Sequence, residues 1–182
     1  MNIMIASDIH GSSVFCRELL AAFEREGAER LFLLGDILYH GPRNDLPDGY
    51  DPKSVASMLN AIKDKIVCVR GNCDSEVDGM MLDFPITAES VILYAGNTFI
   101  YATHGHKCGE LDPPPHSDGD IILTGHTHVP RCAEHDGYIY MNPGSVSIPK
   151  EGSPRGYMTL TDGRFSWKTL DGETYMEYAL SR

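Results

Sequence analysis

The N-terminal part of the chain, residues 1–72, alternates short apolar runs with helical apolar periodicity, and this order restricts the possible folds more than any other feature. Short continuous apolar runs predict buried strands, whereas apolar residues that recur every three or four positions predict helices. The predicted order is strand 3–6, a helix from Ser12 or Ser13 to about residue 26, strand 31–34, a helix beginning at Asp51-Pro52, and strand 66–69. A β-α-β-α-β order implies parallel strands joined by helical crossovers.

The pattern changes after about residue 88. Two strand-like runs, 91–94 and 98–102, flank an Ala-Gly-Asn turn and predict a hairpin. A further strand-like run covers residues 120–124, and later Asp-Gly pairs mark turns between strands. We therefore expect the second half of the chain to be mainly antiparallel β-structure.

Length, charge and cysteine content limit the class of protein. A chain of 182 residues predicts a single domain, residues 1–182. Residues 1–6 form no basic leader and the five cysteines show no paired spacing, so we expect a cytoplasmic protein with free thiols. No apolar run reaches the roughly 18 residues that would cross a membrane. The net charge of −11 repels polyanions, so stable nucleic-acid binding is not expected and a small anionic ligand is favoured.

Seven polar side chains follow closely after the predicted strands. They are Asp8, His10, Asp36, Asn72, His104, His126 and His128. In open α/β sheets the carboxyl ends of the strands are where ligands bind, so these side chains are expected to lie near one another. Imidazole, carboxylate and amide oxygen together suit metals such as Mn, Fe or Zn. Asp36, with two carboxylate oxygens, could bridge two ions.

Each motif alone also has an ordinary structural explanation. Asp8 could cap a turn, Asp36 follows a glycine in a common turn sequence, and His104 could be a surface or core histidine. His126 and His128 would point the same way on an extended strand, although a solvated loop explains them as well. The complete set, placed at the ends of five strand-like runs, favours a metal site.

The motifs occur in the order Asp-x-His, Gly-Asp, Gly-Asn, His-Gly-His and Gly-His-x-His. In this order the chain resembles the calcineurin-like metallophosphoesterases over most of its length. Its small size and the segments 40–44, 71–78 and 142–147 resemble the small bacterial phosphodiesterases of that family. The resemblance implies an α/β fold of four layers, in which two packed mixed β-sheets are flanked by helices.

The resemblance also implies two divalent metal ions, with Mn expected first and Fe, Ni or Zn as alternatives. The first ion would be held by Asp8, His10, Asp36 and His128, and the second by Asp36, Asn72, His104 and His126. The ions would lie about 3.5–4 Å apart and share a hydroxide that attacks phosphorus. Two divalent ions, two aspartates and one hydroxide leave a charge of about +1, which suits a phosphodiester monoanion better than a monoester dianion.

Cys73 departs from the family pattern, which commonly has a histidine after Gly-Asn, close to the leaving group. A thiol with an ordinary pKa of about 8.5 is a poor replacement for imidazole. His106 and His40 are candidates for the missing acid, but the leaving group could also depart without one, or Cys73 could act as a nucleophile. Arg43 could bind a phosphate oxygen or remain a solvated loop residue. Asp74 is expected to orient a metal ligand.

The resemblance implies a metal-dependent phosphoric diester hydrolase that acts on a small phosphodiester. A phosphomonoesterase or nucleotidase with the same metals is the main alternative. The retromer subunit with this fold is a protein-interaction scaffold, and in such a protein the metal residues would be vestigial. The intact set of acidic, imidazole and amide side chains argues against a scaffold here. Homo-oligomers occur among the relatives, so self-association is a further expectation.

Overall fold

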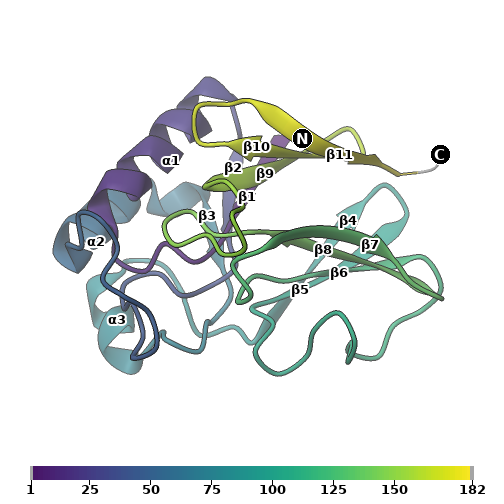
Figure 1. Ribbon diagram of the computed structural model, residues 1–182, viewed down its shortest axis with the longest axis horizontal. Coiled ribbons are helices and arrows are strands. Elements are labelled where there is room, and N and C mark those ends of the chain that lie inside the picture. Colours follow the sequence, from purple (N-terminus) through teal and green to yellow (C-terminus); the bar gives the residue numbers. More distant parts are fainter. Residues whose placement is uncertain (1, 181–182) are drawn as a thin grey trace.

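Two mixed β-sheets pack face to face in the computed structural model, which describes residues 2–180 (Figure 1). The first sheet has the strand order β11 (Thr174–Ala179), β10 (Arg164–Thr169), β9 (Gly156–Thr161), β1 (Asn2–Ala6), β2 (Arg30–Leu33) and β3 (Ile66–Cys68). The second has the order β4 (Ser90–Ala95), β5 (Thr98–Thr103), β6 (Asp120–Leu123), β8 (Tyr138–Pro143) and β7 (Pro130–Glu134). The helices are α1 (Ser13–Arg25), α2 (Pro52–Asn60) and α3 (Glu76–Met81), with a 3₁₀ turn η1 (Lys63–Lys65). The expected pair of mixed sheets flanked by helices is confirmed.

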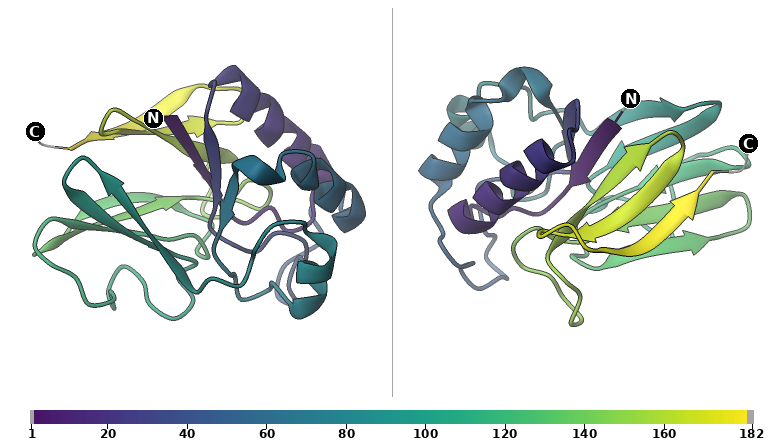
Figure 2. Two further views of the ribbon diagram at one scale, coloured as in Figure 1. Left: turned by 180° about the vertical axis from the view of Figure 1, so that it is seen from behind. Right: turned by 90° about the horizontal axis from the view of Figure 1, so that it is seen from above.

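The two longer helices begin where the sequence supplies side-chain caps. Ser12 Oγ accepts a hydrogen bond from the Phe15 N–H at 3.3 Å, and Asp51 Oδ1 accepts one from the Ser54 N–H at 3.1 Å. These bonds pair N–H groups that the first turn of a helix leaves free. Pro52 begins α2, at a position where no N–H is needed. Both helices lie beside the first sheet and pack their apolar faces against it (Figure 2).

Alternation along β1 divides the interior into two cores. Met4 packs under the helices, whereas Ile3 and Ile5 point to the second sheet, because successive strand residues face opposite sides. The core between the sheets includes the fully buried Trp167, whose Nε1 donates a hydrogen bond to the Asn142 carbonyl at 2.7 Å. The two sheets are therefore joined by packing and by a bond from β10 to β8.

The strand pairing confirms part of the expected topology. β1, β2 and β3 are parallel, and β4 and β5 form the predicted hairpin. However, β6 pairs parallel with both β5 and β8, so the centre of the second sheet is not antiparallel. The connection 104–119 carries the chain back to the start of β6 without a helix, and β7 lies at the sheet edge beyond β8, so that β8 runs beside β6 in the same direction. The short α3, which begins with a Ser75–Asp78 capping box, was not predicted.

The same connection, residues 104–119, covers the outer face of the second sheet. The Tyr138 hydroxyl donates a hydrogen bond to the Glu110 carbonyl at 2.5 Å, and the rings of His116 and Tyr138 lie 4.7 Å apart. Within residues 2–180 this outer layer is a loop, whereas helices form the layer on the first sheet.

Candidate metal centre

The seven predicted ligand residues lie together at the rim where the carboxyl ends of strands from both sheets meet. The first sheet contributes the residues that follow β1, β2 and β3, which are Asp8, His10, Asp36 and Asn72. The second sheet contributes those that follow β5 and β6, which are His104, His126 and His128. Parallel pairing within each sheet brings these ends together, so the topology builds the site from distant parts of the chain.

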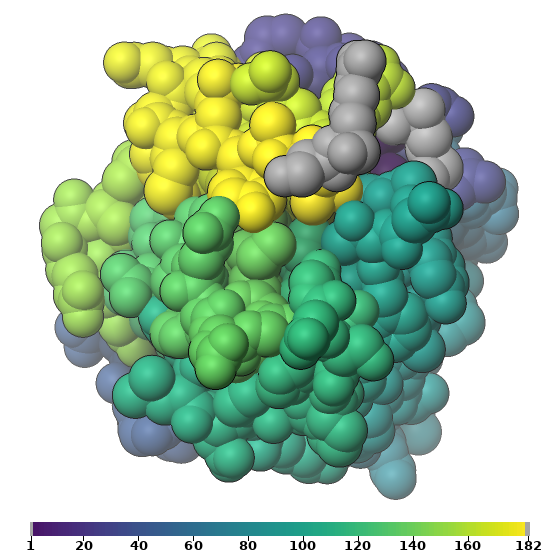
Figure 3. Space-filling model, turned by 90° about the vertical axis from the view of Figure 1, so that its right-hand side faces the viewer, coloured from purple at the N-terminus to yellow at the C-terminus, as the bar shows by residue number. Residues whose placement is uncertain are grey.

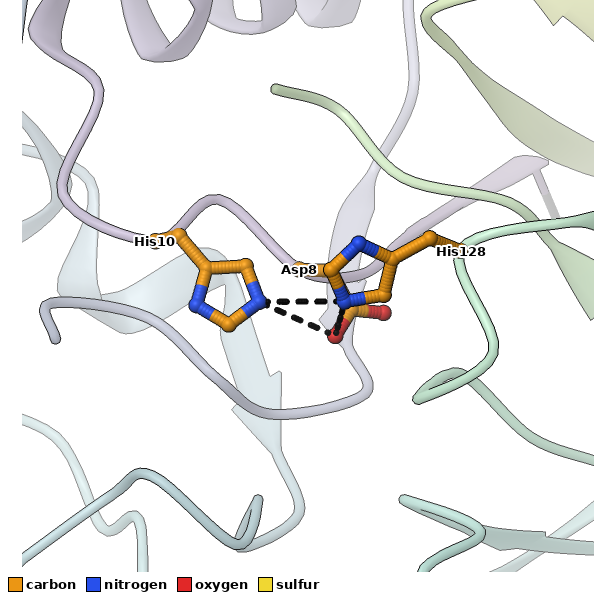
Figure 4. Close-up of side chains that lie close together, drawn as sticks. All are labelled: Asp8, His10 and His128. Atoms are coloured by element: carbon orange, nitrogen blue, oxygen red, sulfur yellow. Dashed lines mark hydrogen bonds and ion pairs between the residues drawn. The ribbon is translucent and has the colours of Figure 1, made fainter. Parts of the chain in front are cut away.

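The first group consists of Asp8, His10 and His128 (Figure 4). Asp8 Oδ1 lies 3.5 Å from His10 Nε2 and 3.2 Å from His128 Nε2. The two Nε2 atoms are themselves 3.2 Å apart. All three side chains are almost completely buried. Three donor atoms therefore converge on one small volume closed to solvent.

Backbone carbonyls orient the histidine rings toward this volume. The Nδ1 atoms of His10, His128 and His104 lie 2.8, 2.7 and 2.6 Å from the carbonyl oxygens of Tyr39, Ile148 and Leu34. A carbonyl can only accept, so each Nδ1 carries a proton, and in the neutral imidazole each Nε2 then presents its lone pair.

A bound cation would stabilise two otherwise unfavourable features of this arrangement. The lone pairs of His10 Nε2 and His128 Nε2 face each other at 3.2 Å, which is repulsive unless a positive charge lies between them. Asp8 Oδ1 is buried and has no hydrogen-bond partner, and such orphaned oxygens are costly in a protein interior. The donors present therefore fit a metal ion.

Asp36 connects this group to the second one. Its Oδ2 lies 3.7 Å from His10 Nε2 and 3.4 Å from His104 Nε2. On the far side of His104, Asn72 Oδ1 lies 3.0 Å and His126 Nδ1 lies 3.2 Å from His104 Nε2. A single carboxylate oxygen thus faces both groups, which is the placement that a bridging ligand requires.

Burial and neighbouring charges set the protonation of the cluster. Burial raises the pKa of Asp8, but the neighbouring imidazoles of His10, His128 and His104 outweigh burial and hold that pKa well below its usual range. Burial lowers the pKa of His104, yet Asp36 and Asp8 raise it to about 9. At His126 burial and His104 both lower the pKa, to about 4. His126 is therefore a neutral imidazole with a lone pair at pH 7.

Five of the seven residues have a left-handed backbone. The φ angles are 58° at Asp8, 49° at His10, 55° at Asp36, 65° at His126 and 63° at His128. Among residues 2–180 only two other non-glycine residues have positive φ. This conformation is uncommon for residues with a Cβ, and strained backbone tends to gather at functional sites. The clustering therefore supports a functional role for this rim.

Asp74 lies beneath the cluster and holds its backbone. Its carboxylate accepts hydrogen bonds from the N–H groups of Asp36 at 2.9 Å, Ile37 at 2.8 Å and Gly71 at 2.7 Å. Asp74 is buried, and burial raises its pKa. The three bonds fasten the loop after β2 to the loop after β3, so Asp74 acts on Asp36 through the backbone.

The turn after β8 supports the cluster from the other side. The hydroxyls of Ser145 and Ser147 donate hydrogen bonds to the Asp8 carbonyl at 2.8 and 3.0 Å. Asn142 Nδ2 donates to the Gly125 carbonyl at 2.6 Å, next to His126. The Asn-Pro-Gly-Ser segment noted in the sequence therefore fixes the backbone beside two candidate ligands.

A cleft of about 400 Å³ opens over the cluster, and we call it the metal cleft. Asp36, Asn72, His126 and His128 form part of its lining, together with Arg43, Cys73, Thr127 and Lys150. Arg43 and Cys73 were candidate site residues, whereas Lys150 was not predicted. Lys150 belongs to no motif, and only the fold brings it to the rim.

A larger cleft, of about 630 Å³, lies where the β4–β5 turn meets the C-terminal strands, and Figure 3 shows this end of the molecule. It is lined by the β4–β5 turn at Gly96 and by Tyr94, Leu160 and Leu180. This turn precedes β5, whereas His104 follows it, so the larger cleft is remote from the candidate ligands.

His106 and His40, the candidate acids, take different positions. The exposed ring of His106 lies 5.5 Å from that of His104, beside the metal cleft. His40 is not part of the cleft lining; its ring packs between Tyr39 and Tyr50, and its buried Nδ1 has no hydrogen-bond partner. Burial and His104 lower the pKa of His106, so this imidazole is poorly suited to protonate a leaving group.

Burial and the nearby carboxylate of Asp36 raise the pKa of Cys73 to about 12. The further carboxylates of Asp74 and Asp8 act in the same direction. The thiol is therefore neutral at pH 7, which argues against the nucleophilic role considered for it.

Comparison with known proteins decides the family. A family model described as the calcineurin-like phosphoesterase superfamily domain matches residues 1–162. The chain belongs to this superfamily. Membership implies divalent metal ions, and the rim described above supplies candidate ligands for them.

One relative and two solved structures show how this calcineurin-like chain compares with known proteins. It is 46% identical to phosphodiesterase YfcE of Escherichia coli (strain K12) over 176 residues, which are 96% of this chain and 95% of that protein. The solved structure of YfcE, a phosphoesterase from E. coli, matches with a TM-score of 0.95 and 43% identity over the whole of both chains. Vacuolar Protein Sorting 29 from Cryptosporidium parvum matches with a TM-score of 0.58 and 21% identity over 98% of each chain, and this likeness shows the fold alone.

Proposed function

We propose that this chain is a metal-dependent phosphoric diester hydrolase. The observation that carries the proposal is the position of Asp36 Oδ2 between His10 Nε2 and His104 Nε2, at 3.7 and 3.4 Å. The first ion would be held by Asp8, His10, Asp36 and His128, and the second by Asp36, Asn72, His104 and His126. Bound divalent ions supply an activated water nucleophile and offset the charge on phosphoryl oxygens. The 46% identity to a phosphodiesterase supports the diester as substrate.

The chain's own residues would bind and orient the phosphate. Arg43 and Lys150 are exposed and line the metal cleft, so they place positive charge there in a chain of net charge −11. The planar guanidinium of Arg43 suits two phosphate oxygens, and the Lys150 ammonium offers a point charge. Because this charge also suits a monoester dianion, the phosphomonoesterase alternative is tested alongside.

The remaining features of the proposal concern the ions, the partners and the location. Manganese is the proposed ion, with Fe, Ni and Zn competing according to availability. The substrate is a small phosphodiester, because the acidic chain disfavours long polyanions. In the part of the chain that the structure describes, no helix has both the length and the apolar character to cross a membrane. The five cysteines are all unpaired, which suits the proposed cytoplasmic location. Self-association of the chain is a separate part of the proposal.

Chelation of metal ions is expected to abolish hydrolysis of bis(4-nitrophenyl) phosphate, and added Mn is expected to restore it. The matched monoester, 4-nitrophenyl phosphate, should give a lower kcat/KM, because a site charge of about +1 suits a monoanion. Both substrates are assayed with the same Mn-loaded protein. A faster monoester would replace the proposal by the phosphomonoesterase alternative, and activity that survives complete chelation would contradict metal dependence.

Removal of the two cleft cations is expected to weaken substrate binding. Arg43→Ala and Lys150→Ala should each raise KM by about tenfold with little change in kcat, because each removes a hydrogen bond to a charged group. The control is Lys53→Ala, which removes the same charge from an exposed position on α2. Steady-state kinetics on the aryl diester measure the effect. Equal KM values in all three variants would show that neither residue contacts the phosphate.

A further inference from the structure

A second cleft, of about 380 Å³, adjoins the metal cleft, and we call it the aromatic cleft. Its lining includes Leu38, Tyr39, Tyr50, Pro52 and Val77. Cys73 lines both clefts, so they lie on either side of this one small side chain.

Hydrogen bonds fix the aromatic cleft close to the candidate ligands. The Tyr39 carbonyl accepts the bond from His10 Nδ1 at 2.8 Å, and the Cys73 N–H donates to Asp36 Oδ1 at 2.8 Å. Cys73 Sγ lies within 4.8 Å of the ligand atoms of His10 and Asp36. A group bound over Cys73 would therefore be one side chain away from the metal centre.

The two clefts differ in chemistry. Charged and polar side chains line the metal cleft, whereas apolar and aromatic side chains dominate the other. Tyr39 is 41% and Val77 is 66% exposed, so apolar surface remains uncovered at the mouth of the aromatic cleft. The ring of His40 meets those of Tyr39 and Tyr50 edge to face, at 4.8 and 5.2 Å, which restricts the motion of this wall. A preformed apolar wall beside a few polar groups is typical of a site for a small organic ligand.

We propose, resting on the phosphodiesterase function above, that the aromatic cleft binds one ester group of the substrate and selects an aromatic alcohol. The phosphate lies in the metal cleft, and one of its two ester groups passes over Cys73 to contact Tyr39 and Val77. The Cys73 side chain is small, so it leaves room for the ester group to pass from the metal cleft to the aromatic cleft. The ring of an aromatic ester buries apolar surface there and can pack against tyrosine, whereas a short alkyl ester gains less.

Two anions that cannot be hydrolysed, diphenylphosphinate and diethylphosphinate, test the proposal by calorimetry on Mn-loaded protein. Wild type is expected to bind the diphenyl probe about tenfold more tightly than the diethyl probe. Tyr39→Ala and Val77→Asp should each remove most of this preference and leave diethylphosphinate binding unchanged. An aspartate is compatible with position 77, because the first turn of a helix favours acidic residues.

The controls are Tyr94→Ala and Met80→Asp. Tyr94 is an exposed tyrosine at the other end of the sandwich, and Met80 lies on α3 with 82% exposure, outside both clefts. Both controls should bind the probes as wild type does. The aromatic cleft would be overturned as a subsite if Tyr39→Ala and Val77→Asp kept the wild-type preference for the diphenyl probe, or if they lost affinity for both probes equally. Either result would leave the proposed function intact, provided that wild type hydrolyses the diester. A wild type that hydrolyses no diester would instead overturn the proposed function, and the substrate assignment with it.

Discussion

Replacement of Asp36 by alanine is expected to remove both metal ions and to lower diester turnover by about 10⁴-fold or more, because the ions supply both the nucleophile and the charge stabilisation. Within residues 2–180, its Oδ2 is the one carboxylate oxygen that lies within 4 Å of both His10 Nε2 and His104 Nε2. Loss of a peripheral donor such as Asn72 should mainly weaken the second ion. Elemental analysis of the folded variants, together with turnover of bis(4-nitrophenyl) phosphate, measures both effects.

Two further variants separate the role of Asp36 in metal binding from its role in the fold. Asp36→Asn keeps an oxygen that can accept the Cys73 N–H bond, so it should fold as wild type does and still lose the bridged pair of ions. Asp64→Ala, in η1 at the other end of β3, removes an exposed carboxylate and should change neither ion content nor rate. An Asp36→Ala protein that retains both ions would contradict the bridging assignment.

Gly71→Ala is expected to destabilise the protein and disrupt metal binding, although it adds a single methyl group. A Cβ at residue 71 would lie 2.1 Å from Asp36 Oδ1 and 2.3 Å from the Asp36 nitrogen. Since backbone atoms cannot move aside easily, the loops after β2 and β3 must separate. The cost should be about 1–3 kcal/mol or more in the free energy of unfolding, as for other overpacked sites.

Gly109→Ala is the matched control. No atom lies within 4 Å of a Cβ built there, and neither glycine has a positive φ. The control should therefore stay within about 0.5 kcal/mol of wild type. Urea unfolding and the metal content of each folded protein are the measurements. If Gly71→Ala matched Gly109→Ala in both unfolding free energy and metal content, the close approach of the two loops would not be needed for the site.

The sequence predicted the parts of this protein that depend on local pattern. The caps at Ser12 and Asp51 start α1 and α2 as expected, because a side-chain cap acts within one turn. The parallel order of β1, β2 and β3 follows from the helical crossovers between them. The rim location of the seven candidate ligands was predicted by their position after strands, which a parallel sheet brings to one edge.

Features that depend on tertiary contacts were not predictable in this way. The parallel pairing of β6 with β5 is set by the irregular connection before it, which carries no helical pattern, and its pairing with β8 is set by the edge position of β7. Lys150 reaches the metal cleft only through the chain path after β8. The bonds from Ser145 and Ser147 to the Asp8 carbonyl join residues more than a hundred positions apart. His40 was a candidate acid from the sequence, yet packing between two tyrosines holds it outside the metal cleft.

The number of metal ions required for activity tests the proposed dinuclear centre most directly. Metal-free protein is titrated with Mn while bound metal is counted by elemental analysis and turnover of bis(4-nitrophenyl) phosphate is followed. Because Asp36 is proposed to join two ions into one centre, activity should rise to a plateau at two bound ions per chain. A plateau at one ion per chain, or full activity without bound metal, would contradict the account.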